Sequence, residues 1–487
     1  MAESIYDKLG NPVAMTIFLL TLLTPVAVGL FAMIRTRNQS DFFIGGRSMN
    51  PFVVGLSAVS SGRSSWLVLG LSGMAYMTGT GAVWAIVGYI AVEAWQFIWL
   101  GRKLRKDTQT MDSITLLDYF ETRFNDKSRI LRMTGVIIIG IFITAYVAAQ
   151  FNAGAKSLSI ALDISFILSL AISGLLIMVY MVLGGYVAVA YNDVVRALIM
   201  LVGLVVLPVV GVINIGGVGI MLDMLRQLNP ALVDPFSLGA GVIAGFIGIG
   251  LGSPGQPHIV VRYMSIKDPS KLKYSAIYGT LWNIILGIGA ICIGLVGKIL
   301  IPDIGSMPDS DPEMVYLVLS SNYFGPVLYG LLVGGVFAAI LSTADSQLLV
   351  VASTFVRDLY EKVIARNKVI DEQQKLYLSR AVVVFSGILA LLMAYLAQDL
   401  VFWLVLFAWG GLGAAFGPAL IMALFWKKTT RAGILSGMIA GTLISIIWRL
   451  WLLEPTGIYE LIPAFTGALL LIIIVSRLTS PGGNPDT

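Results

Sequence analysis

The chain has 487 residues, of which 57% are hydrophobic and only 12% are charged, and its net charge is +5. A soluble domain has roughly 25% charged residues, so this composition excludes a soluble globular enzyme and a disordered chain. Apolar stretches of about 20 residues, in place of alternating strands of about 10, exclude an outer-membrane β-barrel. The single cysteine, Cys292, leaves no intrachain disulfide. The composition therefore predicts an all-α polytopic membrane protein.

Thirteen segments have about the 17–25 residues that cross a bilayer as a helix. They are 13–34, 51–78, 81–100, 133–154, 160–183, 194–213, 237–256, 275–300, 326–354, 381–397, 400–426, 432–453 and 459–476. The N-terminus lacks the basic start of a cleavable signal peptide, so we expect the first span to be retained. An odd number of spans places the two termini on opposite sides of the membrane.

The positions of Lys and Arg predict the orientation, because cytoplasmic loops retain positive charge. With the N-terminus outside, most basic residues lie in cytoplasmic loops, chiefly those near 101–132 and 355–380. The outer loop near 301–325 has four carboxylates and neither Lys nor Arg. Arg262 is counted here among the cytoplasmic residues, and Arg449 among those at the outer edge. The pattern predicts a multi-pass protein of the cell membrane with a cytoplasmic C-terminus, and it assigns the basic excess to topology, with no nucleic-acid partner.

Two spans contain runs of Ser, Gly and Pro that interrupt a helix, at 57–66 and 248–257. Opened backbone inside a bilayer is tolerated only where it lines a protected cavity. Two such interruptions in corresponding halves are typical of an inverted-repeat secondary transporter, with the solute site between the repeats. An alternative is that the small residues only permit close helix packing.

The interruptions lie five spans apart, which predicts a 5+5 repeat. It divides the chain into an extra N-terminal helix and cytoplasmic loop (1–50), a first five-helix repeat (51–213), an inverted second repeat (214–426), and two C-terminal helices with a short tail (427–487). The expected partners are the lipid bilayer and a small-molecule solute, and no obligate protein partner is evident.

The sequences around these interruptions resemble the sodium:solute symporter family, most closely its sodium/proline branch. The resemblance covers nearly the whole chain and is carried by the segments 41–48 (DFFIGGRS), 255–262 (GQPHIVVR), 341–343 (LST) and 410–418 (GGLGAAFGP). It implies a 5+5 inverted repeat, a solute site at the membrane midplane, and uptake driven by sodium through alternating access.

One helix face has the oxygens that a hard cation prefers. Ala339, Ser342, Thr343 and Ser346 follow i, i+3, i+4, i+7 spacing and so share that face. The resemblance places a sodium ion between the backbone oxygens of Ser60, Arg63 and Ala339 and the hydroxyls of Ser342 and Thr343. The alternative is that these hydroxyls only bond back to their own helical turn.

Ionisable side chains within membrane spans are costly and therefore suggest function. Asp193 matches an aspartate that the family places on the inward sodium path, and with Asp345 and Ser346 it predicts a second ion site or the ion's exit path. Glu93 lies about two turns from the inner end of its span, where we expect it to reach the interface.

Arg63 is a departure from the sodium/proline branch, which lacks this arginine and has an acidic residue in place of Gly62. Three interpretations follow. Arg63 pairs with Asp345 and fixes the cavity, or it binds the carboxylate of the solute. In the third, its guanidinium occupies the cation site and makes transport independent of sodium.

The predicted solute pocket comprises Ser64, Trp66, Tyr146, Gln150, Ile249 and Ser253. Trp66 and Tyr146 match aromatic positions of the sodium/proline branch. That branch has aromatic residues in place of Ile249 and Ser253, which predicts a solute different from or larger than proline. The only histidine, His258, is expected at the inner end of its helix and outside any proton relay.

These residues predict a sodium-coupled symporter that imports a small organic solute, such as an amino acid, a proline-like compound or a carboxylate. The alternatives are a sodium-independent or proton-coupled transporter, and a transport-like solute sensor. A membrane enzyme is disfavoured, because the sequence offers neither a His/Cys/Glu metal cluster nor a positioned nucleophile.

Overall fold

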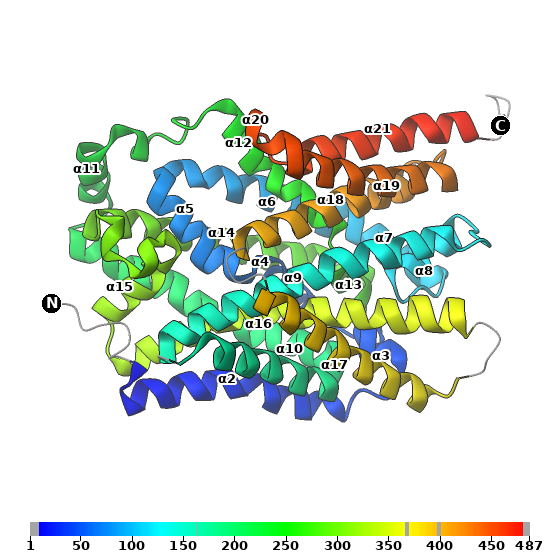
Figure 1. Ribbon diagram of the computed structural model, residues 1–487, viewed down its shortest axis with the longest axis horizontal. Helices are drawn as coiled ribbons and strands as arrows, with labels where there is room; N and C mark the ends of the chain where they lie inside the picture. Colours follow the sequence, from blue (N-terminus) through cyan, green and yellow to red (C-terminus); the bar gives the residue numbers. More distant parts are fainter. Residues whose placement is uncertain (1–8, 163, 366–369, 397–400, 481–487) are drawn as a thin grey trace.

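The computed structural model describes residues 9–162, 164–365, 370–396 and 401–480, and these fold into a bundle of helices (Figure 1). Within these residues, ten helical stretches are long and apolar enough to cross a membrane. They contain α2 (Pro12–Met33), α4 (Pro51–Ser65) with α5 (Leu71–Thr78), α6 (Val83–Trp95) and α7 (Gly101–Thr110), α9 (Ile130–Leu162), α10 (Phe166–Ile215), α14 (Leu272–Leu300), α16 (Pro326–Ser353), α17 (Glu372–Leu396), α18 (Val401–Phe425), α19 (Arg431–Ile447) and α21 (Leu461–Thr479).

Two of these stretches each cover two of the spans predicted from the sequence. The stretch from α4 to α7 has a non-helical residue at Gly79, with φ +65° and ψ −142°, between the spans predicted at 51–78 and 81–100. Helix α10 contains a similar break at Gly185, with φ +54° and ψ −143°. The segment predicted at 237–256 is shorter, and comprises α12 (Ala240–Gly248) and a 3-10 segment, η6 (Ile249–Gly255).

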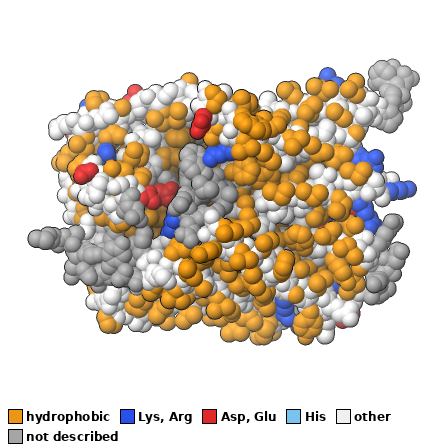
Figure 2. Space-filling view, in the orientation of Figure 1, with side chains coloured by type: hydrophobic (Ala, Val, Ile, Leu, Met, Phe, Trp, Pro, Cys, Tyr) orange, Lys and Arg blue, Asp and Glu red, His pale blue; other side chains and the backbone are white. Residues whose placement is uncertain are grey.

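The helices differ in how much of their surface faces the lipid. In the stretch that contains α16, 83% of the most apolar 18-residue window is buried inside the bundle, but in α2 only 28% is. Helix α16 is therefore the central helix, packed against α10, α2, α9 and α4. The outer helices present apolar side chains over much of the visible surface (Figure 2).

Short helices distinguish the two ends of the bundle. Helices α3 (Gln39–Ile44) and α8 (Leu116–Arg123) lie with α7 at the right-hand end of Figure 1, where Lys and Arg gather in Figure 2. We call this the basic end. Helices α11 (Val218–Leu228) and α15 (Val315–Tyr323) lie at the opposite end. Helix α2 begins at that opposite end and α21 finishes at the basic end, so the described chain starts and stops at different ends.

The basic end is closed by a cluster of buried ion pairs. The guanidinium of Arg132 on α9 contacts the carboxylates of Asp118 and Glu121 on α8 and of Asp358, which follows α16. Its distance to Asp118 Oδ1 is 2.8 Å. Arg357 Nε contacts the other oxygen of Asp118 at 3.3 Å. Side chains from three helical segments thus hold this end together.

The break at Gly185 generates a test of the fold. A Cβ atom there would lie 2.6 Å from the Phe42 ring and 2.8 Å from the Phe42 carbonyl oxygen, and the positive φ disfavours a side chain. We expect Gly185→Ala to destabilise the protein by about 1–3 kcal/mol, seen as a lower melting temperature in detergent. Gly219→Ala in α11 is the control, because its Cβ would meet nothing within 4 Å. Equal melting temperatures for the two variants would contradict this account.

Candidate functional site

Both interruptions predicted from the sequence are present as backbone breaks near the centre of the bundle. Ser64, near the end of α4, has φ +41° and ψ −164°, a conformation that favours glycine, and its hydroxyl accepts the N–H of Trp66 at 3.1 Å. The second break is η6 followed by Gln256 in an extended conformation, after which α13 (Pro257–Ser265) begins. The Gln256 side-chain amide donates to the carbonyl of Trp409 at 3.0 Å, which ties this break to α18.

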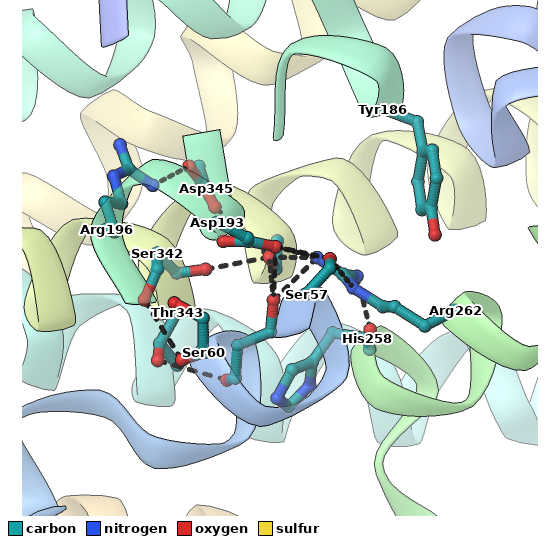
Figure 3. A network of polar contacts seen from close by, with 12 residues as sticks. Ser57, Ser60, Tyr186, Asp193, Arg196, His258, Arg262, Ser342, Thr343 and Asp345 are labelled. Carbon is teal, nitrogen blue, oxygen red and sulfur yellow. Dashed lines mark hydrogen bonds and ion pairs between the residues drawn. The ribbon is translucent and has the colours of Figure 1, made fainter. Parts of the chain in front are cut away.

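The oxygens predicted to bind sodium meet beside the first break (Figure 3). The hydroxyl of Ser342 lies 3.1 Å from the carbonyl oxygen of Ser60 and 2.9 Å from that of Ala339. The hydroxyl of Thr343 lies 3.1 Å from the carbonyl oxygen of Ser61. Two hydroxyls of α16 therefore reach across to the backbone of α4. The carbonyl of Arg63 accepts the N–H of Trp66.

A second cluster of oxygens surrounds Asp193, which is fully buried on α10. Asp193 Oδ2 accepts hydrogen bonds from the hydroxyls of Ser57 at 2.6 Å and Ser61 at 2.9 Å. The same oxygen lies 3.2 Å from Nη2 of Arg262. Ser346, predicted to belong here, lies 2.9 Å from the Ser61 hydroxyl. The structure therefore brings Asp193 and Ser346 together, but with a guanidinium between them.

Asp345 belongs to a different pair from the one that the sequence suggested. Its carboxylate contacts Nη1 of Arg196 at 2.5 Å (Figure 3). It also accepts a hydrogen bond from the hydroxyl of Tyr180 at 2.8 Å. Both partners lie on α10, and Asp345 and Arg196 are almost completely buried. The interpretation that Asp345 balances Arg63 is therefore wrong, because a nearer arginine already neutralises this carboxylate.

Arg63 instead points toward α6 and α14. Its Nε donates to the side-chain oxygen of Asn283 at 2.7 Å, and its guanidinium lies 3.4 Å from the ring centre of Tyr89. The amide of Asn283 in turn contacts the carboxylate of Glu93. Glu93 is 1% exposed, so the expectation that it reaches the membrane interface is wrong. Its carboxylate is instead held inside the bundle by Asn283, in a chain that leads to Arg63.

Tyr89 also explains why position 62 is a glycine. Its hydroxyl donates to the carbonyl of Gly62 at 3.3 Å, and a Cβ at residue 62 would lie only 2.4 Å from that hydroxyl oxygen. An acidic side chain at residue 62, as in the sodium/proline branch, would displace Tyr89.

Four of the six residues predicted for the solute pocket line one cavity, namely Ser64, Trp66, Tyr146 and Ile249. Gly62, Val405, Leu406 and Trp409 complete its lining. The cavity has about 20 Å³ of free space, roughly that of a single water molecule. The indole N–H of Trp66 finds no hydrogen-bond partner among the residues that the structure describes. The pocket is thus formed but too small for a solute in this state.

The other two predicted pocket residues lie elsewhere in the protein core. The Ser253 hydroxyl donates to the side-chain oxygen of Gln96 at 2.9 Å, outside the cavity lining. Gln150 is fully buried, and within the described chain its amide has no hydrogen-bond partner. His258 is fully buried in the first turn of α13, directly after the second break.

A vestibule of about 210 Å³ adjoins the pocket and shares Trp66, Ile249 and Leu406 with it. Arg449, in the π-helical turn after α19, and Glu460, at the start of α21, also line it. Arg449 Nη1 and Glu460 Oε2 are 3.9 Å apart. The carboxylate of Glu460 is buried, and neither of its oxygens accepts a hydrogen bond from another described residue. The last two helices thus add an acid–base pair to the approach to the pocket.

Sequence reasoning missed several of these residues. Trp409 lies on α18, far in sequence from either interruption, but its indole N–H donates to the carbonyl of Ile249 in the second break at 2.9 Å. Arg262 was counted with the cytoplasmic loops, although it is fully buried. Arg262 ends the segment 255–262, which carries the family resemblance. Its place in that segment was the only feature of the sequence that could have indicated a buried, functional arginine.

Comparisons with known proteins agree with this architecture. The model of the sodium:solute symporter family matches residues 42–441. A sodium/proline symporter of Staphylococcus aureus is 35% identical over 467 residues, which cover 93% of this chain and 90% of that protein. The chain belongs to the sodium:solute symporter family. As a member of this family, the protein is a sodium-coupled symporter of a small solute.

Two solved transporters share the fold of this symporter. A Na⁺-coupled sialic acid symporter in a substrate-bound, outward-open state superposes with a TM-score of 0.81 at 18% identity, covering 96% of this chain and 98% of the other. A nucleobase-cation-symport-1 family transporter in a closed conformation gives a TM-score of 0.57 at 14% identity, over 92% and 98% of the two chains. The all-helical membrane transporter fold is therefore common to all three.

One acidic residue of this symporter lies beside the first broken helix, at the end opposite the basic end. A Cβ at Gly70 would lie 3.8 Å from Glu313 Oε1, and one at Gly73 would lie 3.0 Å from the Glu313 backbone nitrogen. Burial raises the pKa of Glu313 to about 7, and Asp311 adds to this rise while Lys156 opposes it. Glu313 therefore binds a proton more tightly in the folded protein than in the unfolded chain.

The raised pKa of Glu313 predicts how stability depends on pH. Between the ordinary value of 4.5 and about 7, the folded state binds more protons than the unfolded state, so stability falls as pH rises through this range. We expect Glu313→Gln to melt at a higher temperature than the parent above about pH 8, and to lose this advantage near pH 4. Melting curves of both proteins across this range provide the measurement. A difference that does not change with pH would contradict the assignment.

Proposed function

We propose that this symporter carries a small zwitterionic solute into the cell, together with sodium bound between α4 and α16. One observation carries the sodium site: the hydroxyls of Ser342 and Thr343 meet the carbonyls of Ser60 and Ser61 at the break in α4. A sodium ion between these oxygens, with the carbonyls of Ala339 and Arg63, would have the hard ligands that it prefers.

The proposed topology is the thirteen-span division with a 5+5 inverted repeat. The breaks at Gly79 and Gly185 support separate spans on either side of each. The helix interruptions in α4 and η6 would then fall in the first helix of each repeat, at 51–213 and 214–426, with 1–50 and 427–487 outside the repeats. The basic end would face the cytoplasm, which places the N-terminus outside and the C-terminus inside.

In this orientation the vestibule opens toward the outside, while the basic end is closed by the ion pairs of Arg132. Sodium binding would stabilise this outward-facing form, and the solute would enter from the vestibule. Movement of the repeats would then open the basic end, with Asp193 on the route by which sodium leaves. The ion drives this cycle because it binds one conformation better than the other.

The position of Arg63 argues against the alternative in which its guanidinium replaces sodium in the cation site. Its guanidinium is held by Asn283 and the face of Tyr89, on α14 and α6. Arg63 could replace sodium only if it gave up both contacts and turned toward α16. We therefore assign it a structural role beside the site.

The vestibule supports a zwitterionic solute. Glu460 could accept an ammonium group and Arg449 could bind a carboxylate, since the two side chains line the same 210 Å³ space. The Staphylococcus aureus relative is named as a proline symporter, and proline is such a zwitterion. Trp409 contributes an aromatic face to the pocket that the sequence comparison did not reveal. This face could pack on a proline-sized amino acid once the pocket widens beyond its present 20 Å³.

Replacing both hydroxyls tests the sodium site. We expect Ser342→Ala/Thr343→Ala to raise the sodium concentration for half-maximal uptake roughly 30- to 150-fold, since each of the two lost ligands costs roughly 1–1.5 kcal/mol. Ser353→Ala is the control, because this hydroxyl on the same helix only bonds the carbonyl of Val350 in its own turn. Uptake into proteoliposomes with sodium replaced by choline is the reference. Undiminished uptake in choline by the parent would refute sodium coupling, and unchanged sodium dependence of the double variant would refute this site.

Neutralising the vestibule pair tests the solute class. We expect Arg449→Gln and Glu460→Gln each to raise the KM for an amino acid about tenfold, because each leaves one charge of the zwitterion without a partner. The amino acid and its amide, which lacks the carboxylate, are then compared as competitors of uptake in the parent and in Arg449→Gln. The variant should bind the amino acid more weakly than the parent does, while its affinity for the amide should change less. The control is Arg226→Gln on α11, where the arginine is exposed and pairs with Asp223. Equal effects on both competitors would contradict zwitterion recognition here.

A further inference from the structure

Arg262 places a positive charge at the centre of the bundle, where the chain is fully buried (Figure 3). Nη2 of its guanidinium lies 3.2 Å from Asp193 Oδ2 and 2.7 Å from the Ser61 hydroxyl, and it also contacts the Ser346 hydroxyl. Its Nε lies 3.2 Å from the hydroxyl of Ser57. One carboxylate and three hydroxyls, from α4, α10 and α16, therefore surround this cation.

These oxygens are the kind that would bind a sodium ion if the guanidinium were absent. Ser57, Ser61 and Asp193 are already joined by hydrogen bonds of 2.6 and 2.9 Å, so the oxygens are held close together. We call these four residues, Ser57, Ser61, Asp193 and Ser346, the Asp193 cage. The cage is built as a cation site, and its occupant is part of the chain.

The Asp193 cage directly adjoins the proposed sodium site. Ser61 contributes its hydroxyl to the cage, while its carbonyl accepts the hydroxyl of Thr343 at 3.1 Å. Ser346 contributes its hydroxyl to the cage and donates it to the carbonyl of Ser342 at 2.8 Å. A sodium ion that left its site toward the basic end would therefore meet the Asp193 cage next.

The negative charge of Asp193 is balanced only when Arg262 is in place. The neighbouring Arg196 is committed to Asp345 at 2.5 Å and to the hydroxyl of Tyr180 at 2.8 Å. Without Arg262, the carboxylate of Asp193 would be buried with only hydroxyl partners, a state that strongly favours uptake of another cation.

We propose that Arg262 is a resident cation that fills a second cation site, so that each transport cycle couples to one sodium ion. The proposal rests on the proposed sodium site between α4 and α16. Arg262 belongs to α13, which follows the second break, and its Nη1 contacts the carbonyl of His258 in the same helix. Movement of α13 away from α4 and α16 withdraws the guanidinium, and sodium then leaves past Asp193. The same movement thus frees the ion's exit past Asp193.

The test counts sodium ions in the purified full-length protein. Binding of radioactive sodium, and the Hill coefficient of sodium-dependent uptake, should both give about one for the parent, because the Hill coefficient cannot exceed the number of coupled sites. Arg262→Gln should raise both values toward about two, since the vacated cage binds a second ion. Arg262→Lys, which keeps the charge, and Asp193→Asn/Arg262→Gln, which removes both charges, should each return the count to about one.

Asp193→Asn alone keeps the inference testable if Arg262→Gln does not fold. With Arg262 present, this variant should still bind one sodium ion, and loss of that ion would make Asp193 a sodium ligand and overturn the proposal. A parent that binds two ions, or a folded Arg262→Gln that still binds one, would overturn it as well. A parent that binds no sodium would instead remove the proposed function on which this inference rests.

Discussion

The ion pair between Asp193 and Arg262 joins helices that the proposed 5+5 division assigns to different repeats. Asp193 lies on the long helix α10, and Arg262 lies on the short helix that follows the second break. Hydroxyls of α4 and α16 complete the contact. Because the pair is fully buried, its two charges stabilise each other far more than they would in water, and separating them demands another partner for each. Any rearrangement of these four helices therefore depends on what replaces this pair.

Three of the buried arginines, Arg63, Arg196 and Arg262, lie near the first break, and each is neutralised in a different way. Arg196 has a direct carboxylate partner, Asp345, and a tyrosine hydroxyl. Arg63 reaches Glu93 only through Asn283 and lies against the ring of Tyr89. Arg262 has a carboxylate and a set of hydroxyls. The proposed exchange of a guanidinium for another cation therefore concerns Arg262 alone, because most of its partners are hydroxyls that could also bind a metal cation.

Much of the architecture could be predicted from the sequence, because it follows from local patterns. Apolar length identifies the spans, and Ser, Gly and Pro runs identify the two helix breaks, both of which are present. The i, i+3, i+4, i+7 pattern on α16 placed Ser342 and Thr343 on the face that meets α4. Pairings between helices could not be predicted in this way. The partners Arg196 and Asp345 are 149 residues apart, and Arg63 and Asn283 are 220 apart. Composition also could not separate a buried arginine, Arg262, from the loop lysines that follow it in sequence, Lys267, Lys271 and Lys273.

The close approach of Tyr89 to Gly62 has a consequence for how this chain could diverge from its relatives. A side chain at residue 62 would strike the Tyr89 hydroxyl, and Tyr89 is also the ring on which Arg63 lies. Residues 62, 63 and 89 are therefore sterically coupled: an acidic side chain at position 62 would fit only if Tyr89 became smaller or moved, and Arg63 would then lose the ring on which it lies. Substitutions at these three positions should therefore have non-additive effects on stability.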